Sequence, residues 1–364
     1  MGNAYTLMKS YLGDRYQRVL IKNTSYKNYL SDGEKVKLGV PQGSILGLLL
    51  FLLYINDLPG SINNLSNLSK LTLFAEDSNI IFTRPNPTEF EEEINKVFEK
   101  IIIWFQINLL LLNLNKTYYI QFLSKTNYAV NVNISHKTNR ISNVCYTNFL
   151  GLMLDSTLSW KPHTDQLISK LNSACYVINS LKSLILLETI RMIYFASVNS
   201  IISYGIIFWS NSNYSNTIFK LQKTVIRIMM NAGSRESCRE LFKKLNILPL
   251  HSKYILSLLL FVVKNINMFK FNSMVHSVNT RQCSDLYLPS VHLTKVQKRV
   301  YHSGIKVFNC LPTGIKGLSG DVRKFKSALK RFPLEGSFYT IQEYFDWDLL
   351  CNPSLGNLSI SNEC

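Results

Sequence analysis

Residues 71–82 read Leu-Thr-Leu-Phe-Ala-Glu-Asp-Ser-Asn-Ile-Ile-Phe, so two short apolar runs flank the acidic pair Glu76-Asp77. Runs of this length around a polar centre predict two strands joined by a tight turn. Neighbouring carboxylates in such a turn can hold divalent cations where phosphoryl groups are transferred. The pair has a second interpretation, since Asp and Ser are common turn residues and could close a hairpin without any ligand.

A glycine-rich segment precedes the acidic pair. It reads Gly39-Val40-Pro41-Gln42-Gly43-Ser44 and leads into an apolar run that ends at Tyr54, which predicts a buried helix. Glycine lets a chain approach nucleic acid closely, so this segment is a candidate for nucleic-acid contact. The alternative is a plain strand-to-helix turn in which Ser44 caps the helix.

The first 155 residues mix predicted helices with predicted strands. Thr88 and Glu91 form a capping box at the start of an amphipathic helix whose apolar side runs from Phe90 to Phe105. Further strands are predicted at residues 118–123, 129–134 and 149–154. Residues 1–155 are therefore expected to form an α+β domain with an antiparallel sheet.

The apolar pattern becomes helical from Lys161 onward. Helices are predicted at residues 167–185, 188–209, 216–230, 236–245 and 250–266. Residues 271–364 are less regular, with turn signals around Pro312 and Gly320 before a basic helix near Val322–Arg331. We therefore expect a helical domain at residues 156–270 and a basic C-terminal region at residues 271–364.

The net charge of +17 over 364 residues predicts a polyanionic partner, nucleic acid first and an acidic membrane surface second. The charge is uneven along the chain. Residues 1–125 carry 13 Lys/Arg against 11 Asp/Glu, whereas residues 126–331 carry 27 against 7. A polyanion is therefore expected to bind the middle and later parts of the chain.

Two groups of basic residues are candidates for that contact. Lys220, Lys223 and Arg227 share one face of a predicted helix, which fits a surface that follows phosphates, although most basic faces are only solvated. Lys298, Arg299, Arg323 and Lys324 belong to a later basic stretch that is interleaved with Tyr301, Phe308 and Phe325. That mixture suits RNA or single-stranded DNA, because cations follow the backbone and rings stack on bases.

The seven cysteines are scattered, with no CxxC pair and no Cys/His spacing typical of zinc. The odd count and the lack of a recognisable signal peptide favour free thiols in an intracellular setting, in the nucleus or the cytoplasm. The apolar runs at residues 45–55, 109–112 and 255–263 are shorter than the roughly 20 residues that cross a bilayer. No membrane partner is therefore expected.

The order of these motifs resembles the reverse transcriptases of non-LTR retrotransposons, in particular jockey-like elements of animals. The resemblance runs over nearly the whole chain. It is carried by residues 10–17, by residues 39–57, by the turn at residues 74–77, by Leu-Asn-Leu-Asn-Lys-Thr at residues 112–117, by residues 148–160, by residues 241–250 and by residues 308–312. The resemblance implies a partial polymerase palm at residues 1–155, a thumb-like helical domain and a basic C-terminal region.

The resemblance also implies a chemistry and its residues. Reverse transcriptases extend a DNA primer on an RNA template with deoxynucleoside triphosphates and two Mg²⁺ ions. By resemblance, Glu76 and Asp77 are the catalytic, metal-binding carboxylates, and Lys116 is a general acid for the leaving pyrophosphate, unless it is only a solvated lysine. Gly39, Gln42, Gly43 and Ser44 would contact the nucleotide and the template.

Three departures from the family pattern bear on activity. The family's first catalytic aspartate lies upstream of the matched region, and neither Asp14 nor Asp32 takes its place. Glu76 stands where the family has the first Asp of its pair, and Leu48 stands where the family usually has proline. We therefore expect a chain that does not polymerise on its own, and a non-catalytic nucleic-acid-binding remnant is the alternative.

Overall fold

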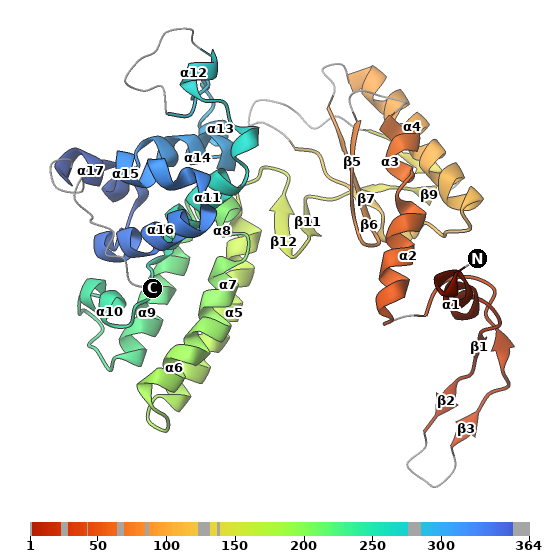
Figure 1. The fold of residues 1–364 in the computed structure, drawn as a ribbon, viewed down its shortest axis with the longest axis horizontal. Coiled ribbons are helices and arrows are strands. Elements are labelled where there is room, and N and C mark those ends of the chain that lie inside the picture. The colour runs from red at the N-terminus through yellow and green to blue at the C-terminus, as the bar shows by residue number, and fades with distance from the viewer. Residues whose placement is uncertain are drawn as a thin grey trace. The chain divides into compact units, whose positions relative to one another are not determined.

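The structure is a computed structural model that describes residues 2–22, 28–41, 43–63, 69–83, 87–122, 132–136, 139–275 and 285–351. It contains two compact units. Unit 1 comprises residues 1–119 and 128–143, and unit 2 comprises residues 120–127 and 144–364 (Figure 1). Helices predominate, and every sheet in the described residues has two strands. The predicted mixed α+β class is confirmed.

Unit 1 begins with a helix and a narrow antiparallel ribbon. After α1 (Asn3–Leu12), β1 (Tyr16–Gln17) pairs with β4 (Glu34–Lys35), and β2 (Leu20–Ile21) pairs with β3 (Tyr29–Leu30). None of the described residues in this segment is fully buried. The ribbon therefore contributes little apolar burial to unit 1.

The core of unit 1 joins a hairpin to three helices. The hairpin consists of β5 (Ser69–Phe74) and β6 (Asp77–Phe82), and the helices are α2 (Ile45–Ile55), α3 (Leu58–Asn63) and α4 (Pro87–Ile107). The buried cluster contains Ile55, Leu58, Ile62, Val97, Ile101 and Trp104, and the inward residues of the hairpin pack against it. Both the predicted hairpin and the predicted amphipathic helix are confirmed, although the side chain of Thr88 lies outside the described part.

The prediction that α2 is a buried helix was wrong. Of its residues, only Gly47 and Ile55 are buried, and Ile45 is 92% exposed. Its exposed apolar side chains recur at helical spacing and form one stripe: Ile45, Leu48, Leu49, Leu52 and Leu53. Composition cannot reveal which side of such a helix packs, because every side of it is apolar.

The apolar segment Ile45–Ile62 is longer than the run at residues 45–55 that was identified in the sequence. Across α2 and α3 it reaches 18 residues, and by length and composition alone it could cross a membrane, with 22% of it buried. This is weak evidence, because a core helix of a soluble protein passes the same test. The turn at Asn56-Asp57 interrupts the segment, and Leu58 and Ile62 lie in the core of unit 1.

The rest of unit 1 is built from short elements. After η1 (Leu114–Lys116), β7 (Tyr118–Tyr119) pairs in parallel with β10 (Ser142–Asn143), and β8 (Ser135–His136) pairs with β9 (Asn139–Arg140). The predicted strand at residues 118–123 is therefore shorter than expected. Of the strand predicted at 129–134, residues 129–131 lie outside the described part and residues 132–134 are not in a strand.

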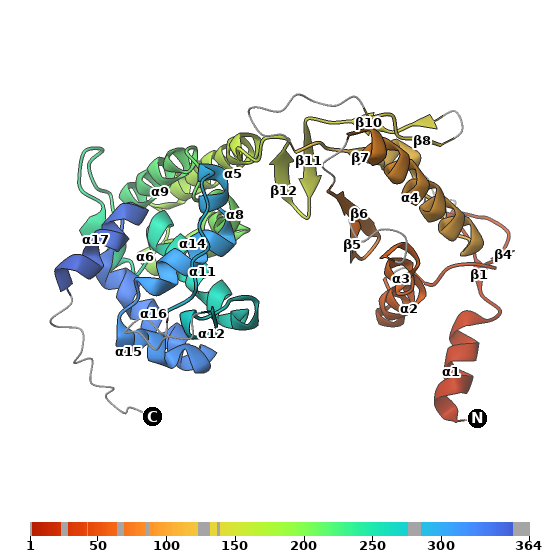
Figure 2. The same ribbon diagram turned by 90° about the horizontal axis from the view of Figure 1, so that it is seen from above.

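Unit 2 starts with a hairpin and continues as a helical bundle (Figure 2). The hairpin pairs β11 (Tyr146–Phe149) with β12 (Leu152–Asp155). The helical elements follow in the order α5 (Lys161–Leu181), α6 (Leu187–Tyr194), η2 (Phe195–Asn199), α7 (Ser200–Ser203), α8 (Ile206–Trp209), α9 (Ser215–Met229), α10 (Arg239–Lys244), α11 (Leu250–Lys264), η3 (Ile266–Met268), α12 (Asn272–Val275), α13 (Thr294–Gln297), α14 (Val300–Asn309), α15 (Thr313–Lys316), η4 (Gly317–Gly320), α16 (Val322–Gly336) and α17 (Ile341–Cys351).

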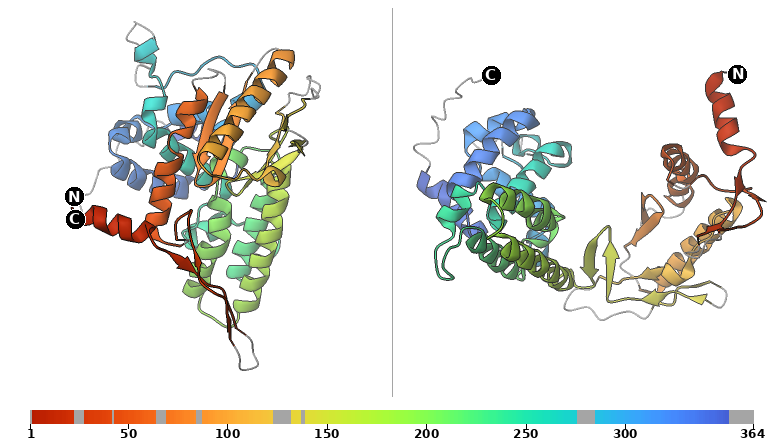
Figure 3. Two further views of the ribbon diagram at one scale, coloured as in Figure 1. Left: turned by 90° about the vertical axis from the view of Figure 1, so that its right-hand side faces the viewer. Right: turned by 90° about the horizontal axis from the view of Figure 1, so that it is seen from below.

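Helix α11 is the centre of this bundle, and α8, α9, α14, α16 and α17 contact it. Figure 3 gives two further views of the helices of unit 2. Helix α14 packs closely on α11 at Gly304, where a Cβ would lie 2.8 Å from Val262 Cγ2. Helix α17 is tied to α14 by Tyr344 Oη, which donates a hydrogen bond of 2.8 Å to the Val307 carbonyl. One core thus spans residues from β12 to α17.

The helix predicted at residues 188–209 is interrupted twice. The η2 segment is a π-helix, and Asn199 at its end accepts a hydrogen bond from Lys253 Nζ of α11. Burial lowers the pKa of Lys253 to about 8. The second break is at Gly205, whose φ of 58° is left-handed and where a Cβ would lie 2.6 Å from Leu152 Cδ2. Close packing on β12 therefore requires glycine there.

The entry to α5 is fixed by Asp155. Its carboxylate accepts hydrogen bonds of 3.0 Å from the backbone N–H groups of Ser159 and Trp160, and another from the Thr157 hydroxyl. Burial would raise the pKa of Asp155, but these hydrogen bonds outweigh it and hold the pKa below its ordinary value. Asp155 thus shapes the left-handed residue Trp160, with φ of 66°, that precedes the helix.

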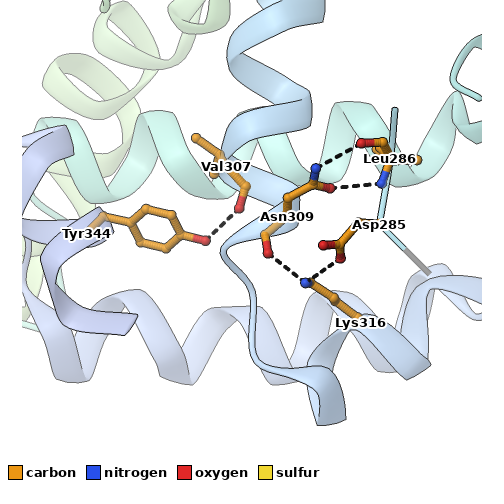
Figure 4. A network of polar contacts seen from close by, with 6 residues as sticks. All are labelled: Asp285, Leu286, Val307, Asn309, Lys316 and Tyr344. Atoms are coloured by element: carbon orange, nitrogen blue, oxygen red, sulfur yellow. Dashed lines mark hydrogen bonds and ion pairs between the residues drawn. The ribbon is translucent and has the colours of Figure 1, made fainter. Parts of the chain in front are cut away.

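A polar network holds the C-terminal helices to the segment before α13 (Figure 4). Lys316 Nζ donates to Asp285 Oδ1 at 2.8 Å and to the Asn309 carbonyl at 2.6 Å. The Asn309 side chain donates to the Leu286 carbonyl at 2.8 Å and accepts from its N–H at 2.9 Å. The ion-pair side chains are 13% and 16% exposed, so solvent screens them weakly.

Replacing Asp155 by Asn should destabilise unit 2 by about 1–3 kcal/mol at pH 7, because an amide N–H₂ would face backbone donors. Since the folded pKa of Asp155 is lowered, its contribution is present above the unfolded pKa of about 3.9 and is lost as pH falls through the folded pKa. Urea denaturation at pH 7 and pH 3, followed by tryptophan fluorescence, should therefore show a smaller difference at pH 3. Asp165→Asn removes an exposed charge of α5 and is the control, and an equal loss there would contradict this role.

Lys316→Met should cost about 3 kcal/mol of unfolding free energy, because it leaves the partly buried Asp285 carboxylate without its cation. The double variant Asp285→Asn with Lys316→Met should recover more than half of that loss. A double-mutant cycle by urea denaturation measures the coupling. Additive single effects would show that the ion pair contributes nothing.

Candidate active site

The turn of the β5–β6 hairpin holds the acidic pair. The register pairs Phe74 with Asp77, so Ala75 and Glu76 form a two-residue turn. Ala75 has a φ of 48°, a left-handed conformation that costs a residue with a Cβ about 1 kcal/mol. The packing of β5 and β6 against the core holds this turn in place.

The two faces of the hairpin differ. Leu71 and its cross-strand partner Ile80 point to the core, and the alternation along β6 places Asp77 on the opposite face with Phe74. Glu76 and Asp77 are exposed, and Phe74 is 61% exposed. The carboxylates therefore reach solvent at the end of a hairpin that packs on the core, where a cation can approach them.

Carboxylate oxygens are the ligands that Mg²⁺ prefers, so the chemistry of Glu76 and Asp77 suits this ion. In the described ranges, however, no group of three or more His, Cys, Asp or Glu side chains could hold a metal ion. The pair supplies two carboxylates but does not complete a site for two ions.

The glycine-rich segment forms a structured entry to α2. Gly39 and Gly43 have φ of 80° and 81°, and Gln42 lies outside the described residues. Ser44 caps the helix by accepting from Gly47 N at 3.1 Å, and it donates to the Pro41 carbonyl at 2.7 Å. The capping role weighed for Ser44 is confirmed, whereas contact of Gly39, Gln42, Gly43 and Ser44 with a nucleotide stays a prediction.

Three residues that stabilise this entry were not identified from the sequence. Tyr11 Oη of α1 hydrogen-bonds to Ser44 Oγ, and the Arg15 guanidinium donates to the Gly39 carbonyl. At Gly47, a Cβ would lie 2.7 Å from Ser44 Oγ, so only glycine fits next to the Ser44 side chain that caps the helix. No local signal predicts the first two contacts, because each joins residues more than 20 positions apart.

Lys116 lies in the short helix η1 and is exposed. Asn113 shapes the turn, since its side-chain oxygen accepts from the Lys116 N–H at 3.3 Å. In the described residues no hydrogen bond or ion pair joins Lys116 to the hairpin turn. Its role as a general acid stays a prediction.

The basic face of α9 is less open than expected. Lys220 is exposed, but Lys223 Nζ lies 4.8 Å from the centre of the Phe219 ring. Arg227 donates through Nε and Nη2 to the Glu236 carbonyl at 3.0 and 2.8 Å. Contact of Lys220, Lys223 and Arg227 with nucleic acid stays a prediction, with two of the three cations half-buried.

The later basic stretch divides into exposed cations and buried rings. Lys298 Nζ donates to Asn213 Oδ1 at 3.0 Å, and Arg299 is exposed just before α14. Arg323 and Lys324 are exposed in the first turn of α16, where their N–H groups donate to Asp321 Oδ1. These four residues remain candidates for nucleic-acid contact.

The prediction that the rings of this stretch stack on bases was wrong for two of them. Phe308 and Phe325 are 1% and 0% exposed and belong to the core of unit 2. Tyr301 is partly exposed but stacks on Phe269, with ring centroids 4.9 Å apart. Phe308 and Phe325 therefore recur along the stretch because they lie on the buried apolar faces of helices, and not because they form a surface on which bases stack.

Comparison with known proteins gives a distant match. No family model and no solved structure matches the chain. It is 28% identical over 253 residues to a probable RNA-directed DNA polymerase from transposon BS of Drosophila melanogaster, which covers 67% of this chain and 27% of that protein. It is also 27% identical over 169 residues to a probable RNA-directed DNA polymerase from transposon X-element of the same organism, covering 46% of this chain and 18% of that protein.

The chain thus spans about a quarter or less of the length of these relatives. The resemblance found in its motifs is confirmed by overall sequence similarity. This chain is distantly similar to the RNA-directed DNA polymerases of non-LTR transposons, over part of their length.

Proposed function

We propose that this chain is a polymerase portion of a non-LTR retrotransposon reverse transcriptase. The observation that carries the proposal is the hairpin turn, where exposed carboxylates of Glu76 and Asp77 stand at the tip of two strands packed on the core of unit 1. The similarity to transposon polymerases supports it. In this reading residues 1–155 are a partial palm, residues 156–270 a thumb-like domain and residues 271–364 a basic C-terminal region.

The proposal assigns separate roles to the residues. Asp77 and Glu76 hold Mg²⁺, which neutralises charge on the nucleotide phosphates when bound. Lys116 donates a proton to the leaving pyrophosphate. The segment with Gly39, Gln42, Gly43 and Ser44 contacts the nucleotide and the template. Lys220, Lys298, Arg299, Arg323 and Lys324 contact the backbone of the RNA template and DNA primer.

We infer that the chain does not polymerise efficiently by itself. Glu76 is one methylene longer than Asp, and a misplacement of about 1 Å at a reacting centre can cost on the order of 100-fold in rate. In addition, the described residues contribute no third carboxylate to the pair. The site therefore depends on a ligand from outside the described part of the chain.

A second candidate function is nucleic-acid binding without synthesis. The observation that favours it is unit 2, which has its own core and contains most of the surplus positive charge. Such a unit can fold and bind a polyanion without any help from the hairpin turn.

Primer extension separates the two candidates. Purified chain, a primed RNA template, Mg²⁺ or Mn²⁺ and four deoxynucleotides should give little or no extension, and Glu76→Asp should increase it by about 10-fold or more if the turn is the catalytic one. Asp77→Ala should abolish any extension, whereas Glu99→Ala, which removes an exposed carboxylate of α4, should not change it. RNA binding, measured by fluorescence anisotropy, should be the same for all these variants.

The outcomes have distinct meanings. Extension that survives Asp77→Ala would exclude the hairpin turn as the catalytic site. No extension by any variant, together with tight RNA binding, would support the binding function. Loss of both activities in a folded sample would contradict both proposals.

A further inference from the structure

Helix α2 exposes an apolar face that the described residues of unit 1 leave uncovered. Of its side chains, only those on the side of Gly47 and Ile55 turn toward the core. Five large side chains on the other side are between 47% and 92% exposed, and we call them the α2 stripe: Ile45, Leu48, Leu49, Leu52 and Leu53. These side chains are therefore open to contact from outside unit 1.

The α2 stripe has the geometry of a helix-packing surface. Its members follow the spacing i, i+3, i+4, i+7 and i+8, which is typical of a helix face that packs against another helix. No charged side chain stands between Ile45 and Ile55. The stripe exposes on the order of 500 Å², so two such stripes together reach the roughly 1,000 Å² that a weak specific interface requires.

The distribution of charge allows two copies of unit 1 to approach each other. The whole chain has a net charge of +17, which opposes association of most of its surface with itself. Residues 1–125, however, carry 13 Lys/Arg against 11 Asp/Glu and are nearly neutral. Repulsion between two α2 stripes is therefore weak, and this part of the chain is the one best suited to self-association.

A lipid surface does not fit the stripe. Helices that lie on membranes carry Lys or Arg along their polar side, whereas α2 contains neither and is followed by Asp57. The segment Ile45–Ile62 could cross a membrane only by taking Leu58 and Ile62, which are 0% and 1% exposed, out of the core of unit 1. The stripe is therefore suited to a protein surface of the same apolar kind.

We propose that the chain forms a symmetric dimer in which the α2 stripes of two copies pack against each other in antiparallel orientation. Because both copies use the same surface, the contact is closed and the assembly stops at two. Leu49 is the middle residue of the stripe and meets its counterpart near the twofold axis. Ile45 of each copy lies beside Leu53 of the other. This dimer goes beyond the proposed function and does not depend on it.

Electrostatics favours the antiparallel orientation over the parallel one. Asp57 is exposed just after the end of α2. In an antiparallel pair, this carboxylate comes to the N-terminal end of the second helix, where the helix dipole is positive. In a parallel pair, the two Asp57 carboxylates would come together and repel each other.

Sedimentation equilibrium tests the dimer. The full chain, treated with nuclease, is measured from about 1 to about 100 μM in about 0.5 M NaCl, which screens charge-driven association. We expect a monomer–dimer equilibrium with a dissociation constant on the order of 10 μM, because the interface is small. Leu49→Glu should raise this constant at least 10-fold, and the milder Leu49→Ala at least 5-fold. Leu111→Glu changes a side chain that is 98% exposed and outside the stripe, so it should have no effect.

Pairs of charged variants test the orientation. Leu49→Glu and Leu49→Lys should each be monomeric, and their mixture should dimerise. Ile45→Glu mixed with Leu53→Lys should also dimerise. Ile45→Glu mixed with Ile45→Lys should not, because in the antiparallel pair the two Ile45 positions lie about 12 Å apart along the helix axis. The opposite result for the two Ile45 mixtures would overturn the antiparallel arrangement.

Other outcomes overturn the dimer itself. A wild-type chain that stays monomeric at about 100 μM shows that no second copy covers the stripe. Binding of that monomer to uncharged phosphatidylcholine vesicles, lost in Leu49→Glu, would assign the stripe to a lipid surface instead. A dimer that Leu49→Glu and Leu49→Ala both leave intact has its contact elsewhere and overturns the proposal as well. Because these measurements contain no nucleic acid, their failure is separate from a failure of primer extension or RNA binding.

Discussion

The burial of helix α11 is the constraint on which unit 2 depends. Leu250, Tyr254, Ile255, Leu258, Leu259 and Val262 are all 0% exposed, and together they cover about half of the circumference of the helix. A helix with so broad a buried apolar face must be enclosed by other elements. The elements that enclose it come from both sides in sequence, from α8 to α17. The basic stretch after residue 294 therefore buries Ile305, Phe308, Phe325 and Leu329 in the same core, while Lys298, Arg299, Arg323 and Lys324 remain exposed.

Unit 1 is built differently, because much of its apolar surface stays open. The stripe on α2 and the outer face of the hairpin expose large side chains, including Ile81 at 56% and Leu53 at 65%. A contiguous apolar surface of this kind is typical of a face that another chain or segment covers. The hairpin that carries the acidic turn thus packs on the core with one face and exposes its other face.

Much of the local structure could be predicted from the sequence, because it depends on neighbouring residues. The two short apolar runs in residues 71–82 predicted the hairpin, and the helical spacing from Phe90 to Phe105 predicted α4. Contacts between distant residues could not be predicted in this way. The approach of Arg239 to Tyr339 joins positions 100 residues apart, and the Asn309 side chain binds the Leu286 backbone only after α14 has folded. The break at Gly205 likewise depends on Leu152 of another element.

The π-helical turn at Phe195–Asn199 makes the length of its segment as important as its composition. Each residue of an α-helix rotates the chain by about 100°, so one residue more or fewer turns everything beyond it to another side. Asn199, the last residue of this turn, accepts a hydrogen bond from the amine of Lys253. A related chain with one residue fewer between Arg191 and Ser203 would present a different side chain to that amine, even if every remaining residue were identical. When related sequences are aligned over this helix, a single-residue gap therefore means that a different side chain faces Lys253.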